Sequence, residues 1–417
     1  MYCHMKNYHL YKHRCALARH SSFTMIYLRR TITLGMRSLK KIKIKYMVAS
    51  LVTLVLLEYF GAFTHIFERN FYVEFDYPLE GDITPYIEQL KNKEKPDIQP
   101  LNVYNYTFIS KCDRKCSEGE SSQLRLVYIV KSAMLNFQRR MAIRNSWGFE
   151  KRFSDVPIRT VFVLGVSSPG TGDLQQSIEN ESRNYGDIVQ ADFLDTYFNN
   201  TIKTMIGFQW VMNFCMNSKF YMFVDDDFYV STKNVLRFLR NPTEYPQYLE
   251  MPVIALQQFK KSQERTDLQL KEQSLKLNRR IHQIDFELPD DVKLFSGFVF
   301  VSAPHRHRSS KWFVTLSEYP FHMWPPYVTA GAYVLSHAAL VDMHYGSLYT
   351  KHFRFDDIYL GLVALKAGIE PYHCPEFYFY KKDYSVHAYR YVIASHGYGE
   401  PSELAAVWNE QKSIGNA

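Results

Sequence analysis

The first 45 residues contain no aspartate or glutamate, although they hold eleven lysines and arginines. The chain has a formal net charge of +8, but residues 46–417 hold 39 basic and 42 acidic side chains. The excess positive charge is therefore confined to the N-terminal tail. Because a nucleic-acid-binding domain carries its basic residues on a folded face, this distribution argues against binding of nucleic acid.

Cysteine is scarce, with six residues in a chain of 417. Two belong to the basic tail and four to the rest of the chain: Cys3 and Cys15, then Cys112, Cys116, Cys215 and Cys374. No second pair with zinc-ligand spacing accompanies Cys112 and Cys116, so a zinc centre is not expected. In an oxidising compartment the four later cysteines allow two disulfides, with three possible pairings.

An apolar run at residues 47–67 matches the roughly 20 residues that a helix needs to cross a bilayer. A buried core helix is one alternative; a signal peptide would begin nearer the N-terminus and end in a small-residue cleavage site. Four lysines flank the run on its N-terminal side, so the positive-inside rule leaves the tail in the cytosol. We therefore predict four parts: a cytosolic tail (1–45), a transmembrane signal-anchor (46–67), a lumenal stem (68–120) and a lumenal body (121–417).

Three N-glycosylation sequons begin at Asn105, Asn180 and Asn199. A single sequon is a weak signal because the motif is short. All three follow the apolar run, and this agrees with a lumenal position for the body.

From Gln123 onward, apolar runs of strand length alternate with segments of helical period. The predicted strands cover residues 124–130, 160–166, 187–193, 220–224 and 294–302. One predicted helix covers 139–147, and another, capped by Asn200 or Thr201, carries an apolar stripe through Ile202, Ile206, Trp210 and Phe214. The alternation predicts an α/β fold, in which the first half of the body is a largely parallel sheet with helices on both faces.

Asp225, Asp226 and Asp227 directly follow one of these strands. Because side chains alternate along a strand, Asp225 and Asp227 are expected on one side and Asp226 on the other. Ligands of open α/β sheets bind beyond the carboxyl ends of strands, and hard divalent cations prefer oxygen ligands. The triplet therefore predicts a metal and phosphate site; a solvated acidic turn is the alternative.

A second acidic pair, Asp356 and Asp357, precedes an apolar-faced helical segment. Capping of that helix needs only one aspartate. The other invites a catalytic interpretation, since a carboxylate can remove a proton from an attacking hydroxyl. Two late histidines, His387 and His396, are candidates to complete a metal shell, although a single histidine is more often structural.

Two further regions have distinctive compositions. Residues 257–293 are highly charged, and we interpret them as a solvated surface helix and loop. Residues 311–336 are rich in tyrosine, tryptophan and proline, which suits a sugar-stacking cleft but suits an ordinary core better.

Seven segments together resemble the animal β-1,3-galactosyltransferase family, which includes β-1,3-N-acetylglucosaminyltransferases. They span about 121–410 and occur in the family's order: RRMAIRNSWG (139–148), VFVLG (161–165), DIVQADFLDTYFNNTIKT (187–204), FVDDDFYV (223–230), KWFVTLSEYPFHMWPPYVTAGAYVLS (311–336), FDDIYLG (355–361), and His396 with Pro401 and Trp408. One such match would be weak, but seven in order are specific.

The resemblance implies an α/β catalytic domain of the nucleotide-diphospho-sugar transferase type (GT-A, Rossmann-like) behind one transmembrane helix. It implies a UDP-sugar donor, Mn²⁺, inversion at the anomeric carbon and residence in the Golgi membrane. The expected reaction transfers galactose from UDP-galactose to the 3-hydroxyl of a sugar on a glycoprotein or glycolipid. The alternatives are transfer of N-acetylglucosamine or N-acetylgalactosamine, including glycosphingolipid synthesis, a catalytically silent Golgi partner protein, and a metal-dependent phosphohydrolase.

The resemblance also assigns roles to individual residues. Asp225 and Asp227 match the ends of the family's DxD element, so Asp227 is expected to ligate the metal and Asp225 to assist it or hold the ribose. His396 matches a late histidine on the metal side, with His387 in reserve, and Asp357 is the expected general base. Donor contacts are expected from six residues: Arg140, Arg144, Lys203, Asp226, Gly331 and Tyr333.

Two positions depart from the family's pattern. Asp356-Asp357-Ile358 stands where the family has Glu-Asp-Val, and Ala-Gly-Ala at 330–332 stands at its glycine-rich turn. The second acid is kept, but the fit of the donor or acceptor sugar is in question. The oligomeric state is not fixed by the sequence.

Overall fold

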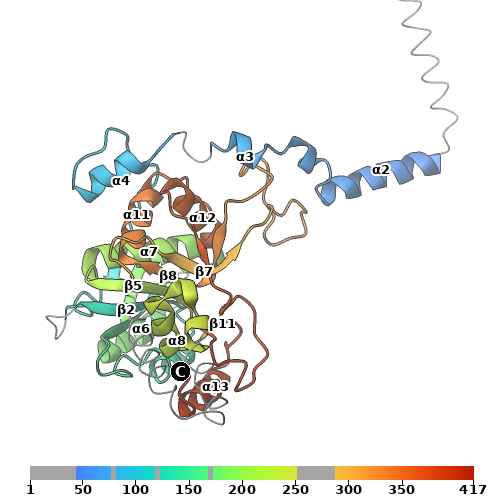
Figure 1. Ribbon diagram of the computed structural model, residues 1–417. Coiled ribbons are helices and arrows are strands. Elements are labelled where there is room, and N and C mark those ends of the chain that lie inside the picture. Colours follow the sequence, from blue (N-terminus) through green and yellow to red (C-terminus); the bar gives the residue numbers. More distant parts are fainter. Residues whose placement is uncertain (1–43, 77–80, 118–122, 168–171, 251–286) are drawn as a thin grey trace, which may run out of the picture. The chain divides into compact units, whose positions relative to one another are not determined.

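The computed structural model describes residues 44–76, 81–117, 123–167, 172–250 and 287–417 (Figure 1). The chain divides into two compact units. The smaller unit contains residues up to Asn70 together with Pro304–His322, and the larger unit contains Phe71–Ala303 and Met323–Ala417. Most of the charged region 257–293 lies outside the described residues, so its interpretation as a surface helix and loop stays a prediction.

The smaller unit contains the helix α2 (Ile44–Tyr59) and the 3-10 helix η1 (Thr64–Phe67). Its buried Arg306 donates hydrogen bonds to the Glu68 carboxylate at 2.7 Å and to the carbonyl of Val314 at 2.9 Å. The side chains of α2 are exposed along the whole helix. Within the part of the chain that the structure describes, no helix has both the length and the apolar character needed to cross a membrane.

The larger unit is built on an eight-stranded sheet with strand order β1-β4-β3-β2-β5-β8-β7-β9. Its strands are β1 (Phe108–Ser110), β2 (Leu124–Lys131), β3 (Ile158–Val166), β4 (Ile188–Leu194), β5 (Ser218–Asp225), β7 (Phe295–Phe300), β8 (Tyr327–Ser336) and β9 (Tyr372–His373). The four strands β4, β3, β2 and β5 are parallel, which confirms the predicted parallel first half. Strand β8 then pairs antiparallel with both β5 and β7.

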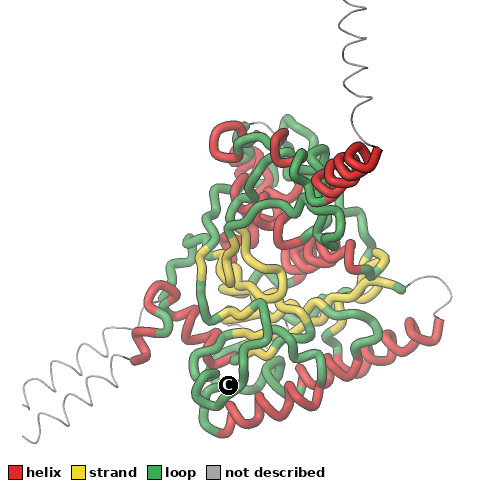
Figure 2. Tube along the Cα trace, turned by 90° about the vertical axis from the view of Figure 1, so that its right-hand side faces the viewer, coloured by secondary structure: helices red, strands yellow, loops and turns green. Residues whose placement is uncertain are grey.

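Helices cover both faces of this sheet (Figures 1 and 2). One layer contains α4 (Thr84–Lys91), α7 (Asn200–Phe214), α11 (His337–Leu348) and α12 (Asp356–Lys366), which pack on one another and on the central strands. The other layer contains α5 (Phe137–Arg144), α6 (Gly172–Tyr185), α8 (Thr232–Arg240) and α13 (Pro401–Ser413). The short strands β6 (Tyr229–Val230), β10 (Phe377–Tyr378) and β11 (Ala394–Ser395) form a second sheet. The α/β prediction with helices on both faces is therefore confirmed.

The segment 68–120, predicted as a stem, contributes regular structure to the larger unit. Strand β1 pairs antiparallel with β4 at the sheet edge, and α4 packs against α11. Cys116 in this segment forms a disulfide with Cys215, which is one of the pairings that the sequence allowed. Among the described cysteines, Cys112 and Cys374 are free thiols, so the second disulfide is not formed.

Helix α7 differs from its prediction in two respects. Its N-cap is Asn199 instead of Asn200 or Thr201, and the Asn199 side chain makes no capping bond to the helix. The predicted apolar stripe is too narrow: Ile202 and Phe214 are only partly buried, whereas the polar Lys203 is buried. A helix enclosed by strands on one side and α11 and α12 on the other buries most of its circumference, and periodicity alone does not reveal this.

Candidate active site

Three consecutive aspartates lie at the carboxyl end of β5, in the middle of the sheet. Asp225 and Asp227 are partly exposed, whereas Asp226 is buried and has different partners. The alternation predicted for the triplet is therefore confirmed. Ligands of α/β sheets bind just beyond the carboxyl ends of the parallel strands, which is where this triplet lies.

A buried lysine joins the two acidic clusters. The Lys131 ammonium group lies 3.0 Å from an Asp225 carboxylate oxygen and 2.9 Å from Asp356 Oδ2, and it donates to the Ala330 carbonyl at 2.9 Å. Burial acts to lower the pKa of Lys131, but the two carboxylates outweigh it and raise the pKa overall. The sequence interpretation missed this residue. Its signal was a charged side chain directly after the apolar run 126–130, at the last position of the strand LRLVYIVK.

The outer aspartates of the triplet have an environment suited to a cation. Burial raises the pKa of Asp225 to about 6, and the nearby charges of Asp227 and Asp356 act in the same direction while Lys131 opposes them. Asp227 Oδ1 is buried and has no hydrogen-bond partner among the described residues. Crowded carboxylates and an unpartnered oxygen are what a hard divalent cation compensates. The described residues contain no group of three potential ligands gathered into a metal site, so other ligands would have to complete the shell.

Asp356 and Asp357 lie in the first turn of α12, as the sequence predicts, but neither caps it: the N-cap is Phe355. Asp356 is buried and accepts hydrogen bonds from Lys131 and, at 3.2 Å, from the Thr204 hydroxyl. Asp357 is only partly buried and accepts from the Ile358 amide at 2.8 Å. Burial and the neighbouring Asp356 raise the pKa of Asp357 to about 7. A carboxyl group with this pKa can exchange a proton near neutral pH.

The middle aspartate, Asp226, anchors the triplet to the rest of the fold. Its Oδ2 accepts from the Ser132 hydroxyl at 2.6 Å and the Asn136 amide at 2.9 Å, and Arg139 donates to Oδ1 at 3.0 Å. Asp226 was predicted to contact the donor, but its buried carboxylate is occupied by protein groups instead. Its bonds fix the turn that carries Asp225 and Asp227.

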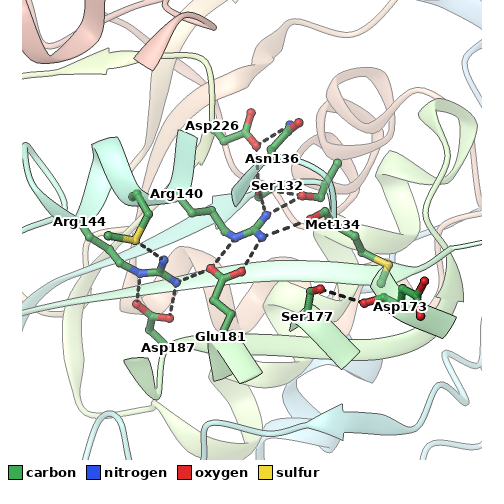
Figure 3. Close-up of polar contacts among 12 residues, drawn as sticks. Ser132, Met134, Asn136, Arg140, Arg144, Asp173, Ser177, Glu181, Asp187 and Asp226 are labelled. Carbon is green, nitrogen blue, oxygen red and sulfur yellow. Dashed lines mark hydrogen bonds and ion pairs between the residues drawn. The ribbon is translucent and has the colours of Figure 1, made fainter. Parts of the chain in front are cut away.

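The two arginines predicted to bind the donor lie in a buried ion-pair network (Figure 3). Arg140 is fully buried and makes a bidentate pair with Glu181 at 2.8 and 2.6 Å. Arg144 pairs with Asp187 at 2.8 Å and with Glu181 at 2.7 Å. The side chains point toward these carboxylates from helix α5. Arg140 also donates to the Ser132 hydroxyl, so it supports the Asp226 anchor rather than presenting its charge to a ligand.

The remaining predicted donor residues are Lys203, Gly331 and Tyr333. Lys203 donates to the Ser132 carbonyl at 2.6 Å and pairs with Asp195 at 2.7 Å. A Cβ on Gly331 would lie 2.6 Å from the ring of the buried Phe228, so a larger residue there would require that ring to shift.

Tyr333, also predicted to contact the donor, is completely buried and stacks on the Phe223 ring with centroids 5.2 Å apart. Its hydroxyl group has no partner among the described residues. The aromatic region 311–336 is mainly core, as we favoured, because Tyr319, Phe321, Trp324 and Tyr333 are all buried.

The two late histidines lie in different surroundings. His396 Nε2 is 3.3 Å from Asp227 Oδ2, and the hydrogen bond and charge of Asp227 raise the pKa of His396 despite burial. His387 lies exposed in a turn, and in the described structure no bond joins it to the acidic triplet. Of the two candidates, His396 is therefore the one that the fold brings to the triplet.

Comparison with known proteins identifies related sequences. A family model described as Galactosyltransferase matches residues 138–288 and 287–375. The β-1,3-galactosyltransferase brn of Drosophila melanogaster is 41% identical over 365 residues, which cover 87% of this chain and 94% of that protein. β-1,3-galactosyltransferase 1 of Homo sapiens is 29% identical over 315 residues, covering 76% of this chain and 81% of the relative. The family match contains both acidic clusters and ends before His396.

Solved structures resemble the chain weakly. The apo structure of the bifunctional glycosyltransferase WbbM gives a TM-score of 0.33 at 12% identity, over 71% of this chain and about half (51%) of that chain. The galactosyltransferase LgtC, in complex with donor and acceptor sugar analogs, gives a TM-score of 0.30 at 13% identity, over 69% of this chain and 94% of that chain.

Proposed function

The chain belongs to the galactosyltransferase family, and we propose that it is a Golgi β-1,3-galactosyltransferase that uses UDP-galactose and inverts its anomeric carbon. A glycosyltransferase implies a nucleotide-sugar donor and a glycan acceptor. One observation carries the proposal. Lys131 ties Asp225, at the end of β5, to Asp356, and Asp356 directly precedes Asp357, whose pKa lies near neutrality. A candidate metal site and a candidate base thus lie together near the carboxyl end of the central strand β5.

We propose a GT-A type fold for the larger unit, with Asp225 and Asp227 holding Mn²⁺ and His396 beside them. The unpartnered Asp227 Oδ1 and the raised pKa of Asp225 support this assignment. Mn²⁺ bound there would neutralise the diphosphate as UDP leaves. Because such cations usually keep positions for phosphate oxygens and water, two carboxylates from the protein are enough to hold it.

Asp357 is the proposed general base. It would remove the proton from the acceptor's 3-hydroxyl as this oxygen attacks the anomeric carbon from the face opposite UDP. A pKa near 7 suits the task, because about half of the Asp357 carboxyl groups are ionised at neutral pH and the carboxylate is basic enough to accept a proton. Lys131 would fix the helix terminus that presents Asp357, by pairing with its neighbour Asp356.

We propose that a membrane anchor at 46–67 holds the protein in the Golgi with the larger unit in the lumen. The basic tail and the exposed apolar side chains of α2 support this placement. The disulfide between Cys116 and Cys215 agrees with an oxidising lumen. The sequon at Asn105 is in an exposed position where an attached glycan would meet solvent.

The test uses the full-length chain in detergent, because neither unit is known to fold alone. UDP-galactose, UDP-N-acetylglucosamine and UDP-N-acetylgalactosamine would each be supplied with β-linked hexopyranoside acceptors, with Mn²⁺ or EDTA. Product linkage would be read by NMR. Two variants would be compared: Asp227→Asn, and Asp291→Asn as a control at an exposed aspartate.

We expect transfer only from UDP-galactose, a β-1,3 linkage, loss of transfer in EDTA, and a drop of about 10²-fold or more in Asp227→Asn alone. Transfer from another donor would replace galactose in the proposal. Free sugar formed without acceptor modification would indicate a hydrolase instead. Mn²⁺-dependent binding of UDP without any transfer would point to a silent partner protein.

A further inference from the structure

Four aromatic side chains form a continuous surface on β7, β8 and the residue after β10; we call this surface the aromatic platform and define it as Phe298, Phe300, Tyr327 and Phe379. Phe300 and Tyr327 are direct partners on antiparallel strands, and their rings stack with centroids 5.8 Å apart. Phe379 packs against Phe298 at 4.7 Å and against Phe300 at 4.9 Å. Each ring thus touches at least one other, and the four form one surface.

The platform is open to solvent. Phe379 is 41% exposed, and the other three rings are partly exposed. Rings that served only the core would be buried, as the nearby Phe295 and Tyr333 are. Only Tyr327 has a hydroxyl group, and it hydrogen-bonds to Ser302 at 3.0 Å, which holds the ring in place. The platform therefore presents mainly ring faces and edges.

The platform begins beside Asp357. Gly361 follows Asp357 by one helical turn and so lies on the same face of α12. A Cβ on Gly361 would lie 2.6 Å from the Tyr327 Cβ, which means that this face of α12 is in direct contact with β8 at Tyr327. The charge of Asp357 also acts on Tyr327. Burial raises the pKa of Tyr327, and the charge of Asp357 adds to the increase.

We propose that the aromatic platform binds the acceptor, by stacking against the apolar face of a β-linked hexopyranose whose 3-hydroxyl points to Asp357. Pyranose rings carry C–H groups on one face and hydroxyls around the edge, so an aromatic surface recognises the face and leaves the edge free to react. Tyr327, which contacts α12, and Phe300, which stacks on Tyr327, hold the reacting sugar. Phe379 extends the surface toward the next sugar of the acceptor. This inference rests on the proposed function.

The uracil ring of the donor is the rival occupant, because nucleobases also stack on aromatic side chains. The structure favours the acceptor. The donor diphosphate must lie at Asp225 and Asp227, whereas the platform continues from Asp357, on whose side the attacking hydroxyl has to arrive. Kinetics with the two substrates varied separately distinguish the two occupants.

The experiment compares four variants of the full-length chain in detergent: Phe300→Ala, Phe379→Ala, the ring-preserving Phe300→Tyr, and Phe149→Ala as a control at a phenylalanine of similar exposure (49%) outside the platform. We expect the KM for the acceptor to rise about tenfold in each of the two platform alanine variants, because each variant removes one stacked ring. The dissociation constant of UDP should change less than twofold. Phe300→Tyr and Phe149→Ala should resemble the unmodified chain.

An unchanged acceptor KM in both alanine variants would overturn the proposal, and so would an equal loss of UDP affinity, which would assign the platform to uracil. Circular dichroism of each variant excludes misfolding as the cause. If the unmodified chain transfers no sugar, the proposed function fails but the platform remains testable. Saturation-transfer NMR should then detect binding of methyl β-galactoside or methyl β-glucoside to the unmodified chain, weakened in Phe300→Ala; absence of such binding refutes the platform by itself.

Discussion

Replacing Lys131 with methionine tests the link between the two acidic clusters. Methionine keeps an unbranched side chain of similar length but removes the ammonium group. Asp356 would then keep only the hydrogen bond from Thr204, and Asp225 would face Asp227 and Asp356 without a cation between them. Both changes leave uncompensated negative charge in a partly buried region of the larger unit.

The magnitude follows from how much solvent reaches each pair. The side chains of Lys131 and Asp356 are 4% and 10% exposed, so removing one partner should cost about 3–5 kcal/mol, the range for a broken buried ion pair. The Asp225 side chain is 37% exposed, and solvent screening should keep its share below about 1 kcal/mol. We therefore expect Lys131→Met to lower the free energy of unfolding by about 3–5 kcal/mol.

Urea unfolding followed by tryptophan fluorescence measures this loss, since Trp147 and Trp210 are buried in the same unit. The double variant Lys131→Met/Asp356→Asn should recover part of it, about 1–3 kcal/mol, because the buried negative charge is gone. Glu370→Gln, at an exposed carboxylate just after α12, serves as the control and should change little. A loss below about 1 kcal/mol in Lys131→Met, or no recovery in the double variant, would show that the buried pair of Lys131 with Asp356 does not stabilise the fold.

Three further predictions follow from the same structure. The pKa of Asp357 is raised above its ordinary value of 3.8 to about 7, so its contribution to stability is present below pH 3.8 and is lost as the pH rises through 7. The rate of transfer should rise as the pH passes through 7, because the base is then ionised. A flat pH–rate profile between pH 6 and 8 would exclude Asp357 as the base. Arg140→Lys should lower the free energy of unfolding by about 3–5 kcal/mol while UDP affinity, measured by calorimetry, stays within twofold; the opposite result would make Arg140 a donor contact after all. Asn105→Gln should remove one N-glycan, because Asn105 is exposed and an attached glycan there would meet solvent; the glycan mass is measured before and after enzymatic deglycosylation, and an unchanged glycan mass in Asn105→Gln would contradict this.

The parts of the site that lie on one element were predictable from the sequence. The alternation of Asp225, Asp226 and Asp227 follows from strand geometry, and the place of Asp356 and Asp357 follows from the apolar face of the helix that they begin. The parallel strands β2, β3 and β5 were recognisable because a strand buried on both faces has an almost continuous apolar sequence.

The parts that depend on distant partners were not predictable. The partner of Arg140, Glu181, lies 41 residues away, and the Asp187 partner of Arg144 lies 43 residues away, so nothing local distinguishes a buried ion pair from a phosphate-binding arginine. The role of Lys131 was not predictable for the same reason, because Lys131 is separated from its partner Asp356 by 225 residues. The three-residue strand β1 is too short to show a period and forms only because β4 offers a free edge.

If Asp357 removes the acceptor's proton, the initial rate of galactose transfer must fall in Asp357→Asn. UDP binding would be measured by calorimetry on the same samples, with Glu370→Gln as the matched control. We expect a rate lower by about 10²–10⁴-fold, the usual contribution of a general base, with UDP affinity within twofold of the unmodified chain. A rate within tenfold of the unmodified chain would contradict it.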